Sequence, residues 1–148
     1  MAKLPSFSTG FRNTILDGED VATTFASGTL DMYGDDGTRP ADSDATEVGG
    51  GTLLASITLP ATPFGAAASG VKSLSGSWTD ASANATGTFD WFRISESGDG
   101  GGASTTAARI DGTIGITAGQ FDLVADKAAS TITEAVTVDT FTITIPLV

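Results

Sequence analysis

The sequence predicts a single all-β domain of antiparallel β-sandwich or jelly-roll type, preceded by an N-terminal arm and one short helix. Three observations favour this fold class. Short runs rich in Thr, Val and Ile recur from Gly28 onward, Gly-, Asp- and Pro-rich turns separate them, and 40% of the 148 residues are hydrophobic. A chain of this length can bury one core. We therefore divide it into residues 1–27, the arm and helix, and residues 28–148, the β-sandwich domain.

The N-terminal region has a different pattern from the rest of the chain. Residues 3–7 are expected to form an extended arm, because Pro5 lies among them and no helical periodicity is present. A short helix is expected from Phe11 to Asp17, with Ser8 or Thr9 as its N-cap, since apolar side chains then recur at helical spacing. The Gly-Glu-Asp sequence at 18–20 interrupts this pattern, and the Thr- and Val-rich run after it does not favour a continued helix.

The β-domain is predicted to contain about eight or nine short strands. Turn-forming residues bound each run, most clearly at 35–51, which is read as a surface loop, and at 98–102, which is read as a hairpin tip. The densest aromatic run, at 86–95, is typical of a central strand packed on both faces. The expected strands are residues 29–33, 52–59, 71–79, 86–95, 105–111, 113–117, 120–124, 131–138 and 141–145.

A core can be predicted from the apolar positions of these strands. Two Trp residues within alternating strands usually fill a core, although an exposed aromatic platform that stacks on sugars is the alternative interpretation for Trp78, Phe89, Trp91 and Phe92. The predicted core comprises Leu30, Tyr33, Leu53, Ile57, Leu74, Trp78, Phe89, Trp91, Ile94, Ile114, Phe121, Val136, Val138, Phe141, Ile143 and Ile145.

Charge and composition exclude several function classes. The chain has 7 Lys and Arg against 18 Asp and Glu, a formal net charge of −11, so phosphate repulsion argues against a nucleic-acid partner. It contains neither His nor Cys, which removes imidazole bases, thiolate nucleophiles, disulfides and the usual zinc ligands. No apolar run approaches the roughly 18 residues of a membrane span, so we expect no membrane partner.

Carboxylates are the remaining candidates for metal or acid–base chemistry. An acidic cluster could supply oxygen ligands to Ca²⁺, but its spacing departs from that of the EF-hand loop, so we expect no metal and no other cofactor. Among the acids expected within strands, nothing in the sequence selects a pair for glycoside hydrolysis, and we expect no enzyme activity. The cluster consists of Asp31, Asp35, Asp36, Asp42, Asp44 and Glu47, and the strand acids are Asp90, Asp111 and Asp122.

Two short motifs resemble known site patterns but lack the surroundings that such sites require. The Asn84-Ala85-Thr86 sequence matches a glycosylation sequon, but no secretory signal precedes it. The Gly-rich run at 98–102 lacks the Lys-Ser/Thr ending of a phosphate-binding loop and is not expected to begin a helix. Neither motif therefore predicts a site.

Several packing and turn segments follow one another in a characteristic order: FRNTILD at 11–17, GTLDMY at 28–33, GTLLA at 51–55, PFGAA at 63–67, ATGTFDWFRI at 85–94 and FTITIP at 141–146. This order resembles a family of small β-rich virion structural proteins of tailed phages and prophages. The resemblance runs from about residue 11 to 146. This chain departs from that family where relatives tend to carry a longer Ala/Leu-rich helix, because residues 18–20 interrupt it here.

The resemblance implies a capsid decoration or cement protein on the outer surface of the phage head, made in the host cytoplasm. Its expected partners are the major capsid protein or other virion subunits, and further copies of itself in a homo-oligomer. Two alternatives stay open, a structural protein of the tail or head-tail junction and a carbohydrate-binding β-sandwich module. High acidity is compatible with a soluble outer face.

The N-terminal arm is the predicted inter-subunit contact. Leu4, Phe7 and Phe11 are spaced too irregularly for one amphipathic face, yet they are too apolar for a purely solvated tail. Docking on a neighbouring subunit would bury these side chains, each worth about 1.5–3 kcal/mol when fully buried. The alternative is that Phe7 and Phe11 cover an open end of their own β-domain.

Overall fold

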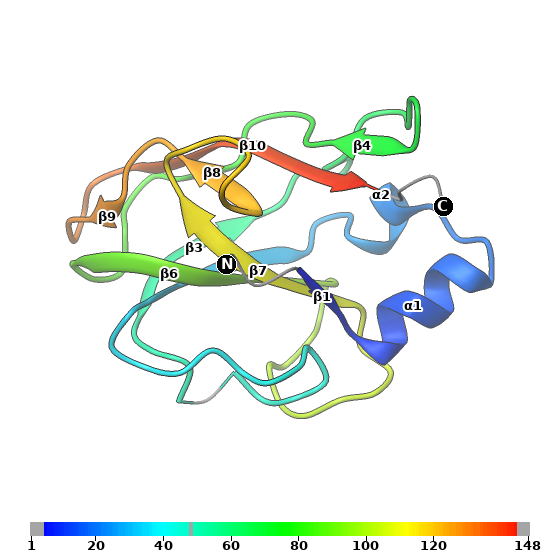
Figure 1. Ribbon diagram of the computed structural model, residues 1–148, viewed down its shortest axis with the longest axis horizontal. Coiled ribbons are helices and arrows are strands. Elements are labelled where there is room, and N and C mark those ends of the chain that lie inside the picture. The colour runs from blue at the N-terminus through cyan, green and yellow to red at the C-terminus, as the bar shows by residue number, and fades with distance from the viewer. Residues whose placement is uncertain (1–4, 48, 145–148) are drawn as a thin grey trace.

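The computed structural model, which describes residues 5–47 and 49–144, is mostly β (Figure 1). Ten strands form one mixed sheet that curls into a half-barrel, and two short helices lie at one end of it. The prediction of a β-rich chain is confirmed, but the sheet is not clearly a sandwich or a jelly roll. It is also not wholly antiparallel, because two of its central strands run parallel to each other.

The elements follow the chain with long loops between several of them. The helices are α1 (Thr9–Leu16) and α2 (Val21–Thr24). The strands are β1 (Ser6–Phe7), β2 (Thr29–Gly34), β3 (Leu53–Thr58), β4 (Val71–Ser73), β5 (Thr79–Asp80), β6 (Gly87–Ser95), β7 (Arg109–Gly115), β8 (Leu123–Ala125), β9 (Ala129–Ser130) and β10 (Val136–Thr144).

The sheet has the order β3-β2-β6-β7-β8-β10-β4, and three two-residue strands are attached to it. Strand β1 pairs with β7, β9 with β6 and β5 with β10. Every pairing of these described strands is antiparallel except that of β7 with β8. One end of β7 is therefore joined to β10 through β8, whereas its other end is lined by the short β1.

Three predicted strand boundaries were wrong. The expected break at Asp111–Gly112 is instead the middle of β7, where Gly112 faces the Phe92 ring so closely that a Cβ atom would collide with it. The two expected C-terminal strands form a single strand, β10, with a register shift between Val138 and Thr140. The expected strand at 71–79 is divided into β4 and β5.

The N-terminal region packs on the same sheet. Helix α1 begins two residues earlier than expected, and Ser8 is its N-cap, with its hydroxyl accepting a hydrogen bond from the Phe11 amide at 3.1 Å. The Phe11 ring is fully buried, 5.2 Å from Phe7 and 5.0 Å from Phe25 between ring centroids. A second helix, α2, forms after the Gly-Glu-Asp interruption, where no helix was favoured.

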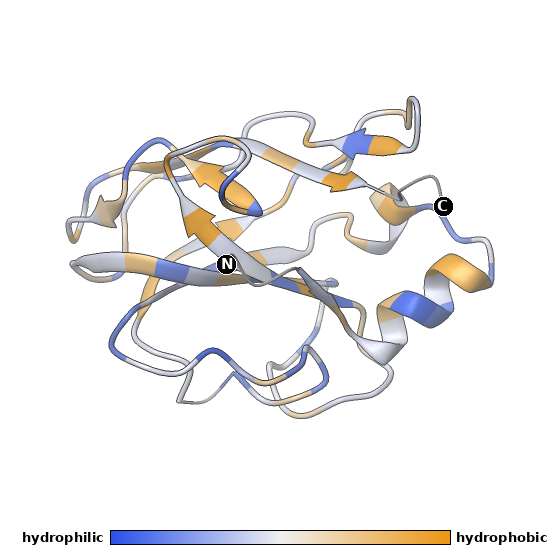
Figure 2. Ribbon diagram, in the orientation of Figure 1, coloured by the Kyte–Doolittle hydropathy of each residue, from blue (hydrophilic) through white to orange (hydrophobic). Residues whose placement is uncertain are grey.

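The core lies inside the curl of the sheet, where Phe64, Trp78, Phe92 and Phe141 are in mutual ring contact. Most predicted core residues are buried there or beneath the loops of the other face. Phe121 is the clear error, because 38% of its surface is exposed, and Leu53 and Leu74 are half-buried. Ile145 lies outside the described residues. Figure 2 shows the hydrophobic residues gathered on the strands and the hydrophilic ones recurring along the loops.

Candidate functional site

A buried ion pair lies on the face of the sheet opposite the core. Arg93 of β6 and Asp111 of β7 are cross-strand neighbours in the register, and both side chains are fully buried. The guanidinium donates from Nε and Nη2 to the two carboxylate oxygens, each at 2.8 Å. Such a bidentate pair is strong and directional. It is held on rigid strands and has no exposed surface from which to act on a substrate.

A second buried pair joins this face to a surface loop. Arg109, also on β7, donates to both carboxylate oxygens of Asp99 and to the carbonyl oxygen of Gly102 at 2.6 Å. Burial alone would raise the pKa of Asp99, but the hydrogen bonds from Arg109 and from the Gly101 amide outweigh it and lower that pKa. We call Arg93, Arg109, Asp99 and Asp111 the ionic cluster. It fastens loop 96–108 to the sheet.

The long loop at 35–52 covers the same face. The Ala45 carbonyl accepts hydrogen bonds from Arg93 at 2.8 Å and from Arg109 at 3.3 Å, and the Gly50 carbonyl accepts one from the Trp91 indole. Gly50 is required here, because a Cβ atom would lie 2.4 Å from the Trp91 ring. These hydrogen bonds hold the loop against the sheet, and the charges beneath it stabilise the fold.

Glu47 of this loop lies in surroundings that disfavour its charged form. Burial raises its pKa, the Tyr33 hydroxyl lowers it by hydrogen bonding, Asp31 raises it and Arg93 lowers it. Together these effects raise the pKa of Glu47. Burial likewise raises the pKa of Tyr33. The Tyr33 ring stacks on Trp91 with centroids 4.4 Å apart, so aromatic side chains lie close to the Glu47 carboxylate.

Three further carboxylates of the predicted acidic cluster accept hydrogen bonds within the chain. Asp36 accepts from the backbone and hydroxyl of Thr52, Asp42 accepts from backbone amides at 44 and 45, and Asp44 accepts from Thr9. These are loop-closing and helix-anchoring contacts. Within the described part of the chain, the acidic residues form no group that could hold a metal ion.

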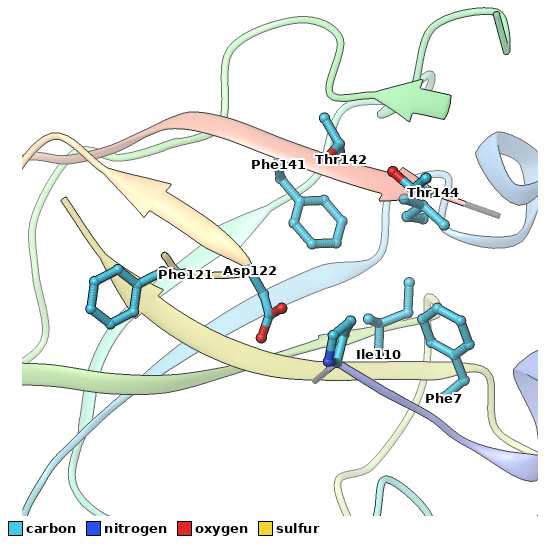
Figure 3. Close-up of a pocket in the computed structure, with 9 residues that line it drawn as sticks. Phe7, Ile110, Phe121, Asp122, Phe141, Thr142 and Thr144 are labelled. Atoms are coloured by element: carbon cyan, nitrogen blue, oxygen red, sulfur yellow. The ribbon is translucent and has the colours of Figure 1, made fainter. Parts of the chain in front are cut away.

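A groove of about 240 Å³, lined by both polar and apolar groups, opens where the half-barrel is incomplete, between β1 and β10 (Figure 3). Phe7 and Ile110 form one side of it and Phe141 and Ile143 the other, and Figure 3 shows Phe7 and Phe141 projecting from opposite sides into the opening. A dry cavity of about 150 Å³ already holds a benzene ring. We call this opening the seam groove. It is lined by Pro5, Phe7, Ile110, Phe121, Asp122, Phe141, Thr142, Ile143 and Thr144.

Both walls of the seam groove carry strand edges. The Ser8 amide donates to the Arg109 carbonyl at 3.0 Å, which puts Phe7 in a non-hydrogen-bonded position of the β1–β7 ladder. On β10, the Leu74 amide donates to the Phe141 carbonyl, which puts Thr144 in the corresponding position of the β10–β4 ladder. The backbone N–H and C=O groups of Phe7 and Thr144 therefore point away from their pairing strands, toward the open side.

Among the described residues that line the seam groove, Asp122 is the only charged one. One of its carboxylate oxygens accepts from the Thr113 amide at 2.8 Å and from the Thr113 hydroxyl at 3.0 Å, which fixes the carboxylate at the end of the groove. Figure 3 shows it directed into the opening from the segment before β8. The groove thus combines apolar walls, two free strand edges and one fixed negative charge.

The structure separates the predicted arm residues. Phe11 is fully buried within its own chain, and Phe7 lies at the seam groove. This arrangement matches the alternative prediction, in which the two rings cover an open end of their own domain. Leu4 lies outside the described residues. Contact of Leu4 and Phe7 with a neighbouring subunit stays a prediction, whereas Phe11 would first have to leave the core.

The aromatic platform is not present on the surface. The exposed fractions of Trp78 and Trp91 are 1% and 0%, and Phe89 and Phe92 are buried as well. Stacking on a sugar needs an accessible ring face. The interpretation of these residues as interior residues is confirmed.

No family model, curated protein or solved structure gives a significant match to the chain. Among the described residues, no helix is both long enough and apolar enough to cross a membrane. The function therefore has to be argued from the physical features of the seam groove and of the covered face.

Proposed function

We propose that the protein is a capsid decoration protein, a non-enzymatic component of a phage virion that binds the outer surface of the head shell and stabilises it. The seam groove is the observation that carries this proposal. It offers apolar walls and unused strand edges, the features by which one protein attaches to an extended segment of another. The resemblance of the sequence to small virion proteins supplies the identity of the partner.

The distribution of charge supports an attachment role over a catalytic one. Arg93 and Arg109 are buried in ion pairs, and Lys72 and Lys127 are paired with Asp20 and Asp126 at 2.9 and 3.6 Å. Four of the seven cations of a chain with a net charge of −11 are thus paired with carboxylates of the same chain. An acidic outer surface keeps a particle soluble and repels other particles and free nucleic acid.

Electron microscopy of phage particles tests this proposal. Particles assembled with and without the protein should differ by density on the outer face of the head, and heads without it should rupture at lower temperature or after milder osmotic shock. Density confined to the tail or to the head-tail junction would overturn the decoration role and favour that other virion position. Particles identical in both preparations would remove the protein from the virion altogether.

A further inference from the structure

We propose that the seam groove binds an extended segment of a partner protein by strand addition, and that this segment carries a large apolar side chain two residues away from a Lys or Arg. The inference rests on the proposed function for the partner's identity, but the chemistry of the ligand is argued from the groove alone. It specifies what the attachment site recognises.

The strand edges determine the form of the ligand. Strands β1 and β10 both run antiparallel to β7, β10 through its pairing with β8, so the two walls of the groove are parallel to each other. An added strand can therefore run in the same sense relative to both. The Phe7 and Thr144 backbone groups that point to the open side supply donors and acceptors for its main chain.

The lining determines the side chains of the ligand. Ile110 and Phe141 are buried at the base of the groove, with Phe7 and Ile143 beside them, and their contacts favour one large aliphatic or aromatic side chain. Successive side chains of a strand point to opposite faces, so only alternate residues of the ligand enter the groove.

Charge selects the residue two positions from that anchor, which enters the groove on the same face of the added strand. Asp122 is held at the end of the groove by Thr113, and only one of its two oxygens is used in those hydrogen bonds. A Lys or Arg at that position would approach the other oxygen, and the net charge of −11 adds long-range attraction for a basic segment. An acidic segment would be repelled by Asp122 and by the net charge of the protein.

Titration of the full-length protein with synthetic hexapeptides, followed by nuclear magnetic resonance, tests the inference. The probe is acetyl-Lys-Thr-Leu-Thr-Val-Thr-amide, and the matched controls replace its Lys by Glu or its Leu by Ser. We expect the probe to shift the amide resonances of Phe7, Ile110 and Ile143. Each control peptide should bind at least about threefold more weakly, because it loses either a charge pair or the apolar anchor.

Two variants identify the contacts. Thr144→Pro removes a backbone donor on the open edge without removing a β10–β4 bond, and it should abolish the shifts, whereas Thr144→Val should retain them. Asp122→Asn keeps the acceptor for Thr113 but not the charge, so the preference for Lys over Glu should fall by about two- to fivefold. Unchanged binding by Thr144→Pro, or an unchanged preference in Asp122→Asn, would overturn the inference.

Three other outcomes also overturn it. If the groove resonances shift when the protein concentration is raised without peptide, the groove binds a second copy of the chain. If the peptide binds only after residues 1–4 are deleted, the groove is occupied by the chain's own N-terminus. Absence of shifts at about 5 mM peptide excludes even a millimolar site. If the peptide binds as expected while the protein is missing from virions, the groove chemistry stands and the proposed function fails.

Discussion

The face of the sheet beneath loop 35–52 and the seam groove are both irregular regions, but they differ in how their polar groups are used. Beneath the loop, the guanidinium groups of Arg93 and Arg109 meet carboxylates and carbonyl oxygens of the same chain. At the seam, the backbone groups of Phe7 and Thr144 point away from the strands that pair with them. The first region is closed by its own contacts and the second is left open.

This difference indicates which region serves the fold and which can serve binding. Taking the two partners of an ion pair out of water costs several kcal/mol each, and removing one partner leaves an uncompensated buried charge. Substitutions in the covered face should therefore change stability. Strand edges that already lie beside an open groove contribute little to stability, so substitutions there should change binding alone.

The largest expected effect follows from removing Asp111. The Asp111→Ala variant leaves the Arg93 guanidinium buried without its carboxylate, and we expect the free energy of unfolding to fall by about 3–5 kcal/mol, measured by urea denaturation. The double variant Arg93→Met/Asp111→Leu removes both charges and should recover most of that loss. If Asp111→Ala unfolds at the wild-type urea concentration, the ion pair does not stabilise the covered face.

Acid should weaken the covered face through Asp99. Its lowered pKa means that the folded state binds fewer protons, so this stabilisation is complete above the ordinary value of 3.8 and is lost as pH falls through the lowered pKa. Thermal unfolding followed by circular dichroism should show a steep loss of stability below about pH 4. Asp99→Asn should be less stable at pH 7 and should lose less on acidification. Parallel curves for the two proteins would contradict this account.

Glu47 should give a smaller effect of opposite sign. Its raised pKa favours the protonated form in the folded state, so the carboxyl group destabilises the fold increasingly as pH rises from 4.5 through the raised pKa. Glu47→Gln can still accept the hydrogen bond from Tyr33 and should raise the melting temperature at pH 7 by less than about 4 °C. Lower stability of the variant would show that attraction to Arg93 outweighs burial.

The sequence was a good guide to the strands and a poor guide to their charged face. The alternation at 29–33, the proline residues that follow residue 59 and the aromatic run at 86–95 located β2, β3 and β6 to within about two residues. Gly112 misled the interpretation of β7, since its role in close packing on Phe92 appears only in three dimensions. Arg93, a charged residue inside an aromatic run, was the one local signal that a buried partner had to exist.

The seam groove had no comparable signal. It arises because β8 joins β7 to β10 at one end only, a parallel pairing that depends on the path of the whole chain. Phe121 was assigned to the core because its run alternates, yet it lies at the groove and is partly exposed. Incomplete closure of a sheet is a global property, so no local pattern in the sequence could have located this site.

Binding of Thr144→Pro and Thr144→Val to phage heads that lack the protein tests the central claim most directly. Sedimentation of heads with each purified variant measures attachment, and thermal unfolding measures stability in the same preparations. We predict that both variants keep their melting temperature within about 2 °C, because no ladder bond is lost, and that only Thr144→Pro fails to sediment with heads. Equal attachment of two equally stable variants would contradict the assignment of binding to the seam groove.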